Sequence, residues 1–346
     1  MGDFTSGARH LGKCLAPRVT VVILNWNGRR FLAPCLDAVL AQTFRDFEIV
    51  LVDNGSSDGS VDFLRAHYPQ VRLVANAHNV GFAAGNNQAM RASQSEFVAT
   101  LNNDAVAEPE WLESLVGAME SDERVGACAS KMLFAHRRDV INSAGIAIDR
   151  AGIAWDRLGG QLDTPSSGAL EPVFGACAGA ALYRRRMLDQ VGLFDEDFFA
   201  YLEDVDLAWR AQWAGWQALY VPDARVYHHH SATAGEGSPF KNRLLGRNKV
   251  WLIVKNYPVP HLAWYLAAIV GYDAAAVVYA LLLRRDWSPL QGRLAGLRGG
   301  WGMLRARRQA RRCRRVGGGQ VLRCMEPLSA PWRVVERYRH IDKVHL

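Results

Sequence analysis

Three polar residues directly after a short apolar segment have side chains suited to binding a metal ion and a phosphate. Asn102, Asn103 and Asp104 follow residues 97–101, which are expected to form a buried strand. Buried parallel strands end at the crevice where ligands bind. Oxygen atoms at that place suit Mg²⁺ or Mn²⁺ carrying a phosphate. The alternative is an Asx cap for the helix predicted over 111–119.

A second candidate lies in the densest acidic cluster of the chain. Glu203, Asp204 and Asp206 occupy the expected first turn of a helix that stops near Gly215. Carboxylates are stable at a helix N-terminus, so capping is one interpretation. The other is catalysis, because burial and like charges raise the pKa of a carboxyl towards that of a general base. The aromatic residues that would provide this burial are Phe198, Phe199 and Tyr201.

Three consecutive histidines, His228, His229 and His230, form a third candidate. Consecutive side chains of an extended segment point to different sides, so at most one or two of them reach the same ion. A structural histidine with a satisfied hydrogen bond is the alternative.

Alternating strands and helices must position these side chains. Apolar β-branched runs predict strands at 19–24, 47–52, 71–75 and 97–101. Helical spacing of apolar residues predicts helices at 30–41, 61–67 and 87–92. Further strands are expected at 180–183 and 216–221, with a polar, irregular segment at 137–168. The alternation predicts an α/β protein with a doubly wound, mostly parallel sheet and a site at the carboxyl ends of its strands.

Polar loops follow the predicted strands. Asp53 lies just past the second strand, where a carboxylate can accept hydrogen bonds from a ribose or a base, although residues 53–59 also have ideal turn chemistry. A glycine-rich loop contains Asn79 and Gly81. Neither stretch matches G-x-G-x-x-G or the Walker P-loop, which argues against a dinucleotide oxidoreductase or an NTPase.

Charge is distributed unevenly along the chain. Of its 346 residues, 284–346 hold 16 Arg and Lys against 4 Asp and Glu, and the rest hold 25 against 30. The tail therefore carries +12 and the body −5, which indicates an anionic partner surface, either nucleic acid or lipid. The six cysteines form no C-x-x-C pair, and no signal-peptide run precedes the first strand, so we expect a reduced, cytoplasmic protein.

The C-terminal region combines a long apolar run with a basic segment. Residues 262–283 are long enough to span a membrane, but Asp273 near the middle makes spanning costly. Apolar residues then recur every three or four positions among arginines, which is typical of a helix at a membrane surface. The alternative is a helix packed on the catalytic domain with a solvated basic face.

Several segments, in their order and spacing, resemble the inverting glycosyltransferases of family 2, especially rhamnosyltransferase-like members that build bacterial polysaccharides. The resemblance covers residues 17–256. It rests on VVILNWNG, LVDNGSSDGS, NVGFAAGNN, LNND, GACAGAALYRR, FDEDFFAYLEDVDLAWR, VYHHHSATAG and GRNKVWLIVKNYP. The family implies the GT-A fold, a nucleoside-diphosphate-sugar donor and Mg²⁺ or Mn²⁺.

The resemblance also implies roles for single residues. Asp53 would contact the nucleoside, and Asp104 would be the metal-binding residue of the D-x-D motif. Asp204 of the pair Glu203–Asp204 would be the general base, and His228 would be a late metal ligand. The other donor-site candidates are Asn25, Asn27, Asn54, Asn79, Gly81, Asn102 and Asn103. Asn102 stands where the motif has its first aspartate, so this site has one negative charge fewer than the family pattern.

The implied function is transfer of a sugar, with rhamnose favoured, to a hydroxyl of a glycan or lipid-linked acceptor in cell-envelope polysaccharide assembly. We expect a tail at 1–16, a catalytic domain at 17–256, and a helical extension at 257–346 that attaches to the cytoplasmic membrane face. No nucleic-acid partner is expected, because the tail has no recognition motif. The alternatives are a catalytically idle member of the same fold, which Asn102 would favour, and a nucleotidyltransferase, which would need a basic pyrophosphate loop.

Overall fold

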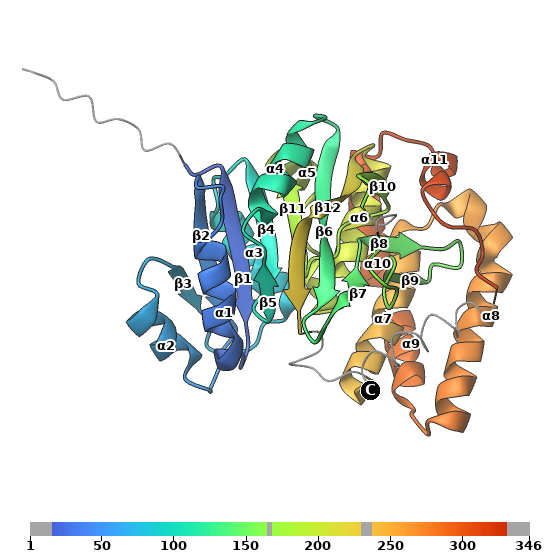
Figure 1. Ribbon diagram of the computed structural model, residues 1–346. Helices are drawn as coiled ribbons and strands as arrows, with labels where there is room; N and C mark the ends of the chain where they lie inside the picture. The colour runs from blue at the N-terminus through green and yellow to red at the C-terminus, as the bar shows by residue number, and fades with distance from the viewer. Residues whose placement is uncertain (1–15, 165–167, 230–236, 331–346) are drawn as a thin grey trace, which may run out of the picture.

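The computed structural model describes residues 16–164, 168–229 and 237–330, so nearly all of the predicted N-terminal tail lies outside the described residues. A ten-stranded sheet runs through the molecule in the order β10-β12-β6-β11-β4-β1-β2-β3, with β5 added to β12 and β7 added to β6 (Figure 1). The Rossmann-like half consists of β1 Val19–Asn25, β2 Phe47–Asp53, β3 Arg72–Ala75 and β4 Phe97–Asn102, all parallel. The predicted doubly wound, mostly parallel sheet is confirmed.

Helices connect these strands and cover the sheet. They are α1 Arg29–Leu40, α2 Ser60–His67, α3 Phe82–Ala92 and α4 Trp111–Glu120. The prediction for α3 was wrong at its start, because residues 82–86 are helical and not loop. Asn86 and Asn87 are buried in that helix, and they are satisfied there: Asn86 Nδ2 donates to the carbonyl of Phe82, and Asn87 Nδ2 donates to that of Phe194.

The second half of the sheet is mixed. Its strands are β5 Ala105–Ala107, β6 Val125–Phe134, β7 Arg137–Ser143, β10 Glu171–Val173, β11 Ala180–Arg184 and β12 Gln217–His228. The pattern did not reveal β6, although all ten of its residues are buried, because Gly126, Ser130 and Lys131 interrupt its apolar run. Lys131 is tolerated there because its Nζ lies 2.8 Å from Asp163 Oδ1.

Two other predictions need correction. The segment 137–168 is not irregular, since it contains β7 and a small separate sheet of β8 Ile146–Ile148 and β9 Ala154–Asp156. The strand expected at 216–221 and the turn after it form the single strand β12, which carries a register shift between Val221 and Arg225. The remaining helices of this half are α5 Arg185–Val191 and α6 Glu203–Trp213.

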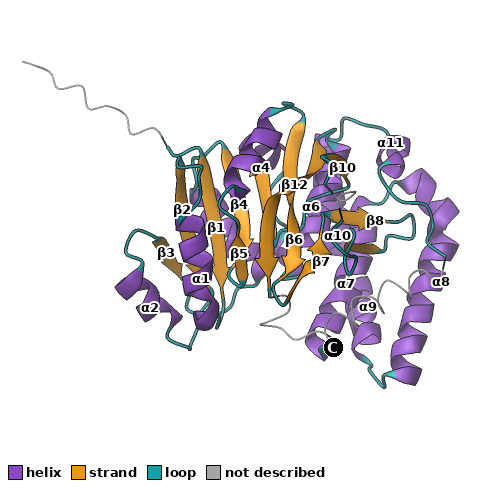
Figure 2. Ribbon diagram, viewed as in Figure 1, coloured by secondary structure: helices purple, strands orange, loops and turns teal. Residues whose placement is uncertain are grey.

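Helices form the C-terminal part of the molecule, at the end of the sheet away from β3 (Figure 2). They are α7 Pro239–Asn256, α8 Val259–Leu283, α9 Ser288–Arg298, α10 Gly300–Ala310 and α11 Gly318–Arg323. Glycines allow α9 to approach α7 closely: a Cβ at Gly292 would lie 2.2 Å from the carbonyl oxygen of Arg243. The predicted basic helix is broken into α9 and α10 at Gly299, which packs against the indole of Trp251.

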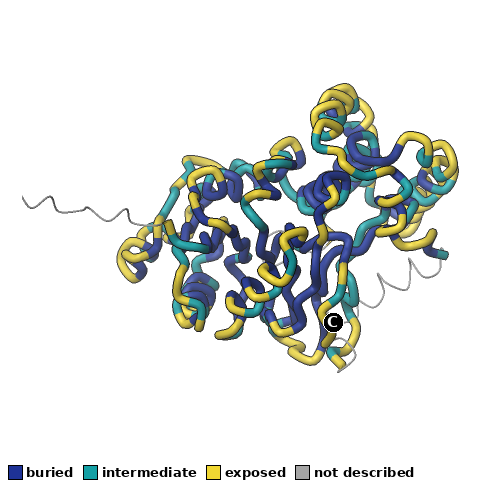
Figure 3. The backbone as a smooth tube through the Cα atoms, turned by 90° about the horizontal axis from the view of Figure 1, so that it is seen from above, coloured by how far each residue is buried: buried dark blue, intermediate teal, exposed yellow. Residues whose placement is uncertain are grey.

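Buried apolar side chains cover both faces of the sheet, and a third cluster joins α6 to the C-terminal helices. This third cluster includes Trp209, Leu252 and Tyr257. Figure 3 shows the buried interior of the sheet and the more exposed helices beyond it. The helix α6, which carries the predicted catalytic carboxylates, is therefore packed between the sheet and α7.

Candidate active site

Three strand ends meet through a chain of buried hydrogen bonds. Asn25 lies beside Asp53 in the register of β1 and β2, and its Nδ2 donates to Asp53 Oδ2 at 2.8 Å. Asn103, just past β4, donates from Nδ2 to Asn25 Oδ1 at 2.6 Å. A side chain at position 28 would collide with this link, since a Cβ on Gly28 would lie 1.9 Å from Asn103 Nδ2. The three strand ends are therefore joined into one hydrogen-bonded wall.

The loop after β2 has the turn chemistry that its sequence indicates. Asp53 Oδ1 accepts a hydrogen bond from the N–H of Ser56 at 2.9 Å, and Asn27 Oδ1 accepts one from the N–H of Ser57 at 2.9 Å. Both oxygens of Asp53 therefore have donors within the protein. These contacts fix the orientation of the carboxylate, and its contact with a nucleoside remains a prediction.

The predicted donor residues of the next loop contact one another. Asn54 Nδ2 donates to Asn79 Oδ1 at 2.9 Å and to the carbonyl of Gly81 at 3.1 Å. Gly81 has a φ of +93°, and a Cβ there would lie 2.7 Å from the carbonyl oxygen of Phe199. Only glycine permits that approach. In this structure the three residues shape the loop and place it against the segment before Glu203.

The predicted metal ligands lie together at the end of β4. His228 is opposite Ala105 in the pairing of β12 with β5, and its Nε2 lies 3.1 Å from Asp104 Oδ1. Asn102 Nδ2 lies 3.2 Å from the same nitrogen. The other ring nitrogen, Nδ1, is 2.9 Å from Asn142 Oδ1. Of the other two histidines, His229 stacks on Phe31 and His230 lies outside the described residues.

This donor set fits a divalent cation. If Nδ1 of His228 donates to Asn142, a neutral ring would present a lone pair at Nε2 towards the carboxylate of Asp104, which a divalent cation between them would satisfy. Without the cation, a proton on Nε2 makes the same contact an ion pair. Ligand atoms on one octahedral ion with bonds of about 2.1 Å lie about 3 Å apart, which is the spacing here. The part of the chain that the structure describes has no cluster of three or more His, Cys, Asp and Glu that could hold an ion. Water and donor oxygens would have to complete the shell.

The charge state of Asp104 also suits a ligand. Burial alone would raise the pKa of Asp104, but the hydrogen bond and charge of His228 outweigh it, and the pKa lies below its ordinary value. The Asx-cap alternative does not hold for the following helix, because α4 starts at Trp111 and its N-cap position is Glu110, whose side chain makes no cap hydrogen bond.

Residues 178–179 lie between Asp204 and Asn102 and are hydrogen-bonded to both. Asp204 Oδ2 accepts from the N–H of Ala178 at 3.1 Å, and the neighbouring Gly179 accepts from the N–H of Asn102 at 2.8 Å. Burial, with the charge of Asp156 adding to it, raises the pKa of Asp204 to about 6, although the N–H groups of Ala178 and Val205 oppose the rise. A half-buried carboxyl with such a pKa is suited to general-base chemistry.

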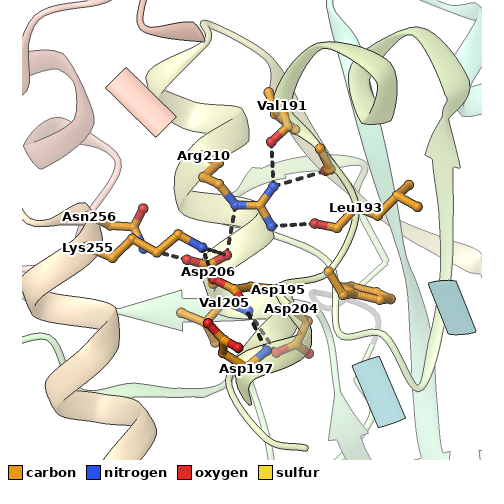
Figure 4. A network of polar contacts seen from close by, with 12 residues as sticks. Val191, Leu193, Asp195, Asp197, Asp204, Val205, Asp206, Arg210, Lys255 and Asn256 are labelled. Atoms are coloured by element: carbon orange, nitrogen blue, oxygen red, sulfur yellow. Dashed lines mark hydrogen bonds and ion pairs between the residues drawn. The ribbon is translucent and has the colours of Figure 1, made fainter. Parts of the chain in front are cut away.

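Glu203 and Asp206 are both buried but differ in their polar partners and in the direction of their pKa shifts. Glu203 is buried, its Oε2 has no hydrogen-bond partner among the described residues, and burial followed by the charge of Asp204 raises its pKa well above the ordinary value. Asp206 is buried among cations: its Oδ2 lies 2.8 Å from Arg210 Nε and 2.9 Å from Lys255 Nζ (Figure 4). Burial would raise the pKa of Asp206, but the charges of Lys255 and Arg210 lower it to about 2.

The segment before Glu203 is strained. Phe199, Tyr201 and Leu202 all have positive φ, at 65°, 68° and 67°. Each non-glycine residue in this region costs on the order of 1 to 3 kcal/mol, so surrounding contacts must hold it there. The carbonyl of Phe199 also accepts from the N–H of Ala83 at 3.1 Å, which ties the strained segment to the start of α3. We call residues 198–202 the strained loop.

Asn248 on α7 holds the strained loop and was missed by sequence reasoning. Its Nδ2 donates to three carbonyl oxygens of the loop, those of Phe198 at 3.0 Å, Ala200 at 2.9 Å and Tyr201 at 2.7 Å. Arg247 donates to the carbonyl of Phe198 at 2.8 Å. The only signal was the presence of both residues in the segment GRNKVWLIVKNYP, to which no role was given.

The sheet carries carboxylates at its strand ends, and the carboxyl of Asp204 at the start of α6 has a raised pKa. Sequence comparison specifies the family of this α/β protein. The model of the family described as "Glycosyl transferase family 2" matches residues 20–192. The chain belongs to this family.

The curated relatives differ in how much of each protein is matched. An uncharacterized protein of Sinorhizobium fredii is 28% identical over 68% of this chain, and the match spans 27% of that protein. An N-acetylglucosaminyl-diphospho-decaprenol L-rhamnosyltransferase of Mycobacterium tuberculosis is 29% identical over 62% of this chain and 77% of the relative. An O-antigen biosynthesis protein of Myxococcus xanthus is 31% identical over 63% of this chain, with only 18% of that protein covered.

Solved structures show the same fold. A mannosyltransferase of Pyrobaculum calidifontis, in complex with GDP-Man and Mn²⁺, has a TM-score of 0.51 at 19% identity and covers 83% of this chain and 88% of its own. Residues 1–349 of S. aureus TarS give a TM-score of 0.56 at 17% identity, with 83% and 81% covered. These likenesses establish the predicted GT-A fold with its C-terminal helices.

Proposed function

We propose that this chain is an inverting glycosyltransferase that moves a sugar from a nucleoside diphosphate to a hydroxyl group of an acceptor. The observation that carries the proposal is Asp204, whose pKa of about 6 leaves it mostly ionised near neutral pH and still basic enough to take a proton. It stands across residues 178–179 from the end of β4, where the predicted metal ligands lie.

In the proposed reaction, Asp204 accepts the proton of the acceptor hydroxyl as its oxygen attacks the anomeric carbon. The new C–O bond forms on the face of the anomeric carbon opposite the bond to the diphosphate. That bond breaks, and the nucleoside diphosphate leaves with its electron pair. One displacement of this kind inverts the configuration. Burial raises the pKa of the neighbouring Glu203 well above its ordinary value, which favours its uncharged form beside the base.

The proposed metal site consists of Asp104 and His228, with Asn142 orienting the imidazole. Bound Mg²⁺ or Mn²⁺ would neutralise charge that develops on the leaving diphosphate. The mannosyltransferase of Pyrobaculum calidifontis, solved in complex with Mn²⁺, supports this choice of cofactor. Asp53 and the wall formed with Asn25 and Asn103 would receive the nucleoside.

Rhamnose is the proposed sugar and a lipid-linked glycan the proposed acceptor, in bacterial polysaccharide assembly at the cytoplasmic membrane face. The names of the mycobacterial and Myxococcus relatives support this assignment. We further propose the division into a catalytic domain at 17–256 and an extension at 257–346. An idle, sugar-binding member of the fold is the second candidate, favoured by the missing first carboxylate at Asn102.

Incubation of the purified chain with a panel of nucleoside-diphosphate sugars, with and without Mn²⁺, tests the proposal. We expect release of the nucleoside diphosphate and transfer to an added acceptor, with inverted configuration by NMR. Asp104→Ala should weaken diphosphate binding in a way that excess Mn²⁺ does not restore, while Asp62→Asn, an exposed carboxylate of α2, should have no effect. Donor binding without any turnover would favour the idle member.

A further inference from the structure

The helix α8 exposes an uncharged face along its whole length. By length and composition α8 is the one helix in the described residues that could cross a membrane, and only 17% of its apolar window is buried. The large exposed side chains of α8 are Val259, Trp264, Leu266, Val270, Val278, Tyr279, Leu282 and Leu283. All exposed residues of α8 are uncharged. With about 1.5 Å per residue, 25 residues make an apolar strip about 37 Å long, far larger than the scattered apolar residues of an ordinary surface.

The charged residue of α8 points to the opposite side. Asp273 Oδ1 lies 2.8 Å from Lys249 Nζ on α7 and 2.9 Å from Arg293 Nη2 on α9. Burial would raise the pKa of Asp273, but the charges of Lys249 and Arg293 keep it below the ordinary value, so the carboxylate stays ionised. A helix that crossed a bilayer would have to leave both cations behind or bring them into the hydrocarbon, and either is costly. This pairing ties α8 alongside the body of the protein.

Basic and aromatic residues follow α8 directly. Residues 284–330 contain 12 Arg and no Lys, against Asp286 and Glu326 as the only acids. Trp264 on α8, Trp287 before α9 and Trp301 on α10 are 85%, 61% and 80% exposed. The exposed arginines of this segment include Arg284, Arg285, Arg298, Arg305 and Arg308. Apolar side chains with tryptophan and arginine around them match the composition of helices that lie at the boundary of lipid headgroups and acyl chains.

We propose that α8 docks in the plane of an anionic lipid surface, with its apolar face among the headgroups and upper acyl chains and the arginines of α9 and α10 against lipid phosphates. The positive charge of the arginines favours an anionic lipid surface over the other possible partners of this face. A second copy of the chain would bring an equally basic segment against the first, and like charges repel. An anionic polymer such as RNA would pair with the arginines but would leave the apolar strip of α8 in water. The attachment does not depend on glycosyl transfer.

Cosedimentation of the full chain with vesicles tests the docking surface. We expect binding to phosphatidylcholine vesicles that contain phosphatidylglycerol, weaker binding to phosphatidylcholine alone, and loss of binding as salt rises. The double variant Trp264→Glu/Leu282→Glu should bind at least tenfold more weakly. Its matched control is Leu162→Glu/Leu170→Glu. These residues are 59% and 50% exposed and lie between β9 and β10, outside the C-terminal helices, so this variant should bind normally.

A charge series completes the test. Arg298→Glu/Arg305→Glu should lower anionic-vesicle binding several-fold, and Arg65→Glu/Arg72→Glu, exposed on α2 and β3, should not. Thermal unfolding of every variant checks that the fold is retained.

Three results would overturn the proposal. The first is no binding to anionic vesicles at low salt. The second is retention in membranes after a carbonate wash, which would show that α8 spans. The third is conversion of a dimer into a monomer by Trp264→Glu/Leu282→Glu, which would make the face an interface between copies. Because none of these measurements uses a sugar donor, they are separate from the test of the transfer reaction.

Discussion

Asp204 and Asp206 lie two residues apart in the first turn of α6, yet their surroundings are opposite. Asp204 receives only backbone N–H groups and lies near the carboxylate of Asp156, so its pKa rises to about 6. Asp206 contacts Arg210, Lys255 and Asn256, and its pKa falls to about 2. The side of the helix that faces Ala178 carries a carboxyl with a raised pKa, and the side that faces α7 carries an ion-paired one.

This contrast separates the proposed catalytic carboxyl from a structural one within one acidic cluster. Helix capping does not account for the cluster, because the N-cap position of α6 is Leu202, which makes no side-chain cap hydrogen bond. Ion pairs with Arg210 and Lys255 account for Asp206, and the catalytic interpretation concerns Asp204. Removal of either carboxylate should therefore change a different property of the protein, and the following predictions separate the two.

Asp204→Asn should have the largest effect. An amide keeps the shape of the carboxylate but cannot take the proton, so kcat should fall by about 10² to 10⁴ while donor affinity stays within a few-fold. Steady-state kinetics and calorimetric donor binding measure the two quantities, with Asp62→Asn as the control. Wild-type turnover in the variant would move the base to another residue, and Glu203 would be the next candidate.

Lys255→Met should instead destabilise the fold. The change leaves the buried carboxylate of Asp206 with one cation fewer and also removes the contact of Lys255 Nζ with Asp195 Oδ2 at 2.5 Å. Breaking a buried ion pair costs about 3 to 5 kcal/mol, which urea denaturation can measure. Arg65→Met, at an exposed position, should change the free energy of unfolding by no more than about 0.5 kcal/mol. An equally small change for Lys255→Met would show that Arg210 and Asn256 are sufficient to hold Asp206.

The pH dependence should differ in sign between the two carboxylates. Asp204 must be ionised to act, so kcat should fall about tenfold per unit as the pH drops below about 6. Because the pKa of Asp204 is raised on folding, ionising it costs stability, and the wild type should lose stability relative to Asp204→Asn as pH rises from about 4 to about 6.

Asp206 has the opposite linkage. Its pKa is depressed on folding, so its stabilising contribution is present above about pH 4 and is lost as the pH falls towards about 2. Unfolding curves of wild type and Asp206→Asn across this range measure the difference. A difference that is constant from pH 2 to pH 6 would contradict the ionic role of Asp206.

Asn102→Asp should have the smallest effect, and it concerns the predicted metal ligands at the end of β4. A second carboxylate near Asp104 and His228 should tighten Mn²⁺ binding several-fold, because it restores the charge missing from the motif. Calorimetric titration with Mn²⁺ measures the change. Equal nucleoside-diphosphate affinity of the wild type with and without metal would contradict the metal site itself.

The sequence predicted the fold and the location of the strand-end residues well, because apolar runs, polar loops and glycines are local signals. The strands ending at Asn25, Asp53 and Asn102 were placed to within one residue. The strand β6 was missed, because its burial depends on neighbours on both sides and its own sequence is only weakly apolar.

The different surroundings of Asp204 and Asp206 on α6 could not be predicted from the sequence. Asp206 is distinguished from Asp204 by Lys255, which lies 49 residues later in the chain, and a contact at that separation leaves no local pattern. The positive φ values of the strained loop could not be predicted either, since Phe199, Tyr201 and Leu202 are residue types that rarely adopt them. They adopt them here because Asn248, almost as distant in sequence, holds the loop by the carbonyls of Phe198, Ala200 and Tyr201.

The helix α7 has a consequence for which insertions this chain can accept. Asn248 holds the strained loop, and Lys255 and Asn256, two turns later, hold Asp206. Each residue of an α-helix advances about 1.5 Å and turns by about 100°. One residue added or lost between 248 and 255 would turn Lys255 away from α6 while Asn248 stayed in place. The number of residues from Asn248 to Asn256 is therefore fixed by the helix, and insertions or deletions can be tolerated only outside this stretch.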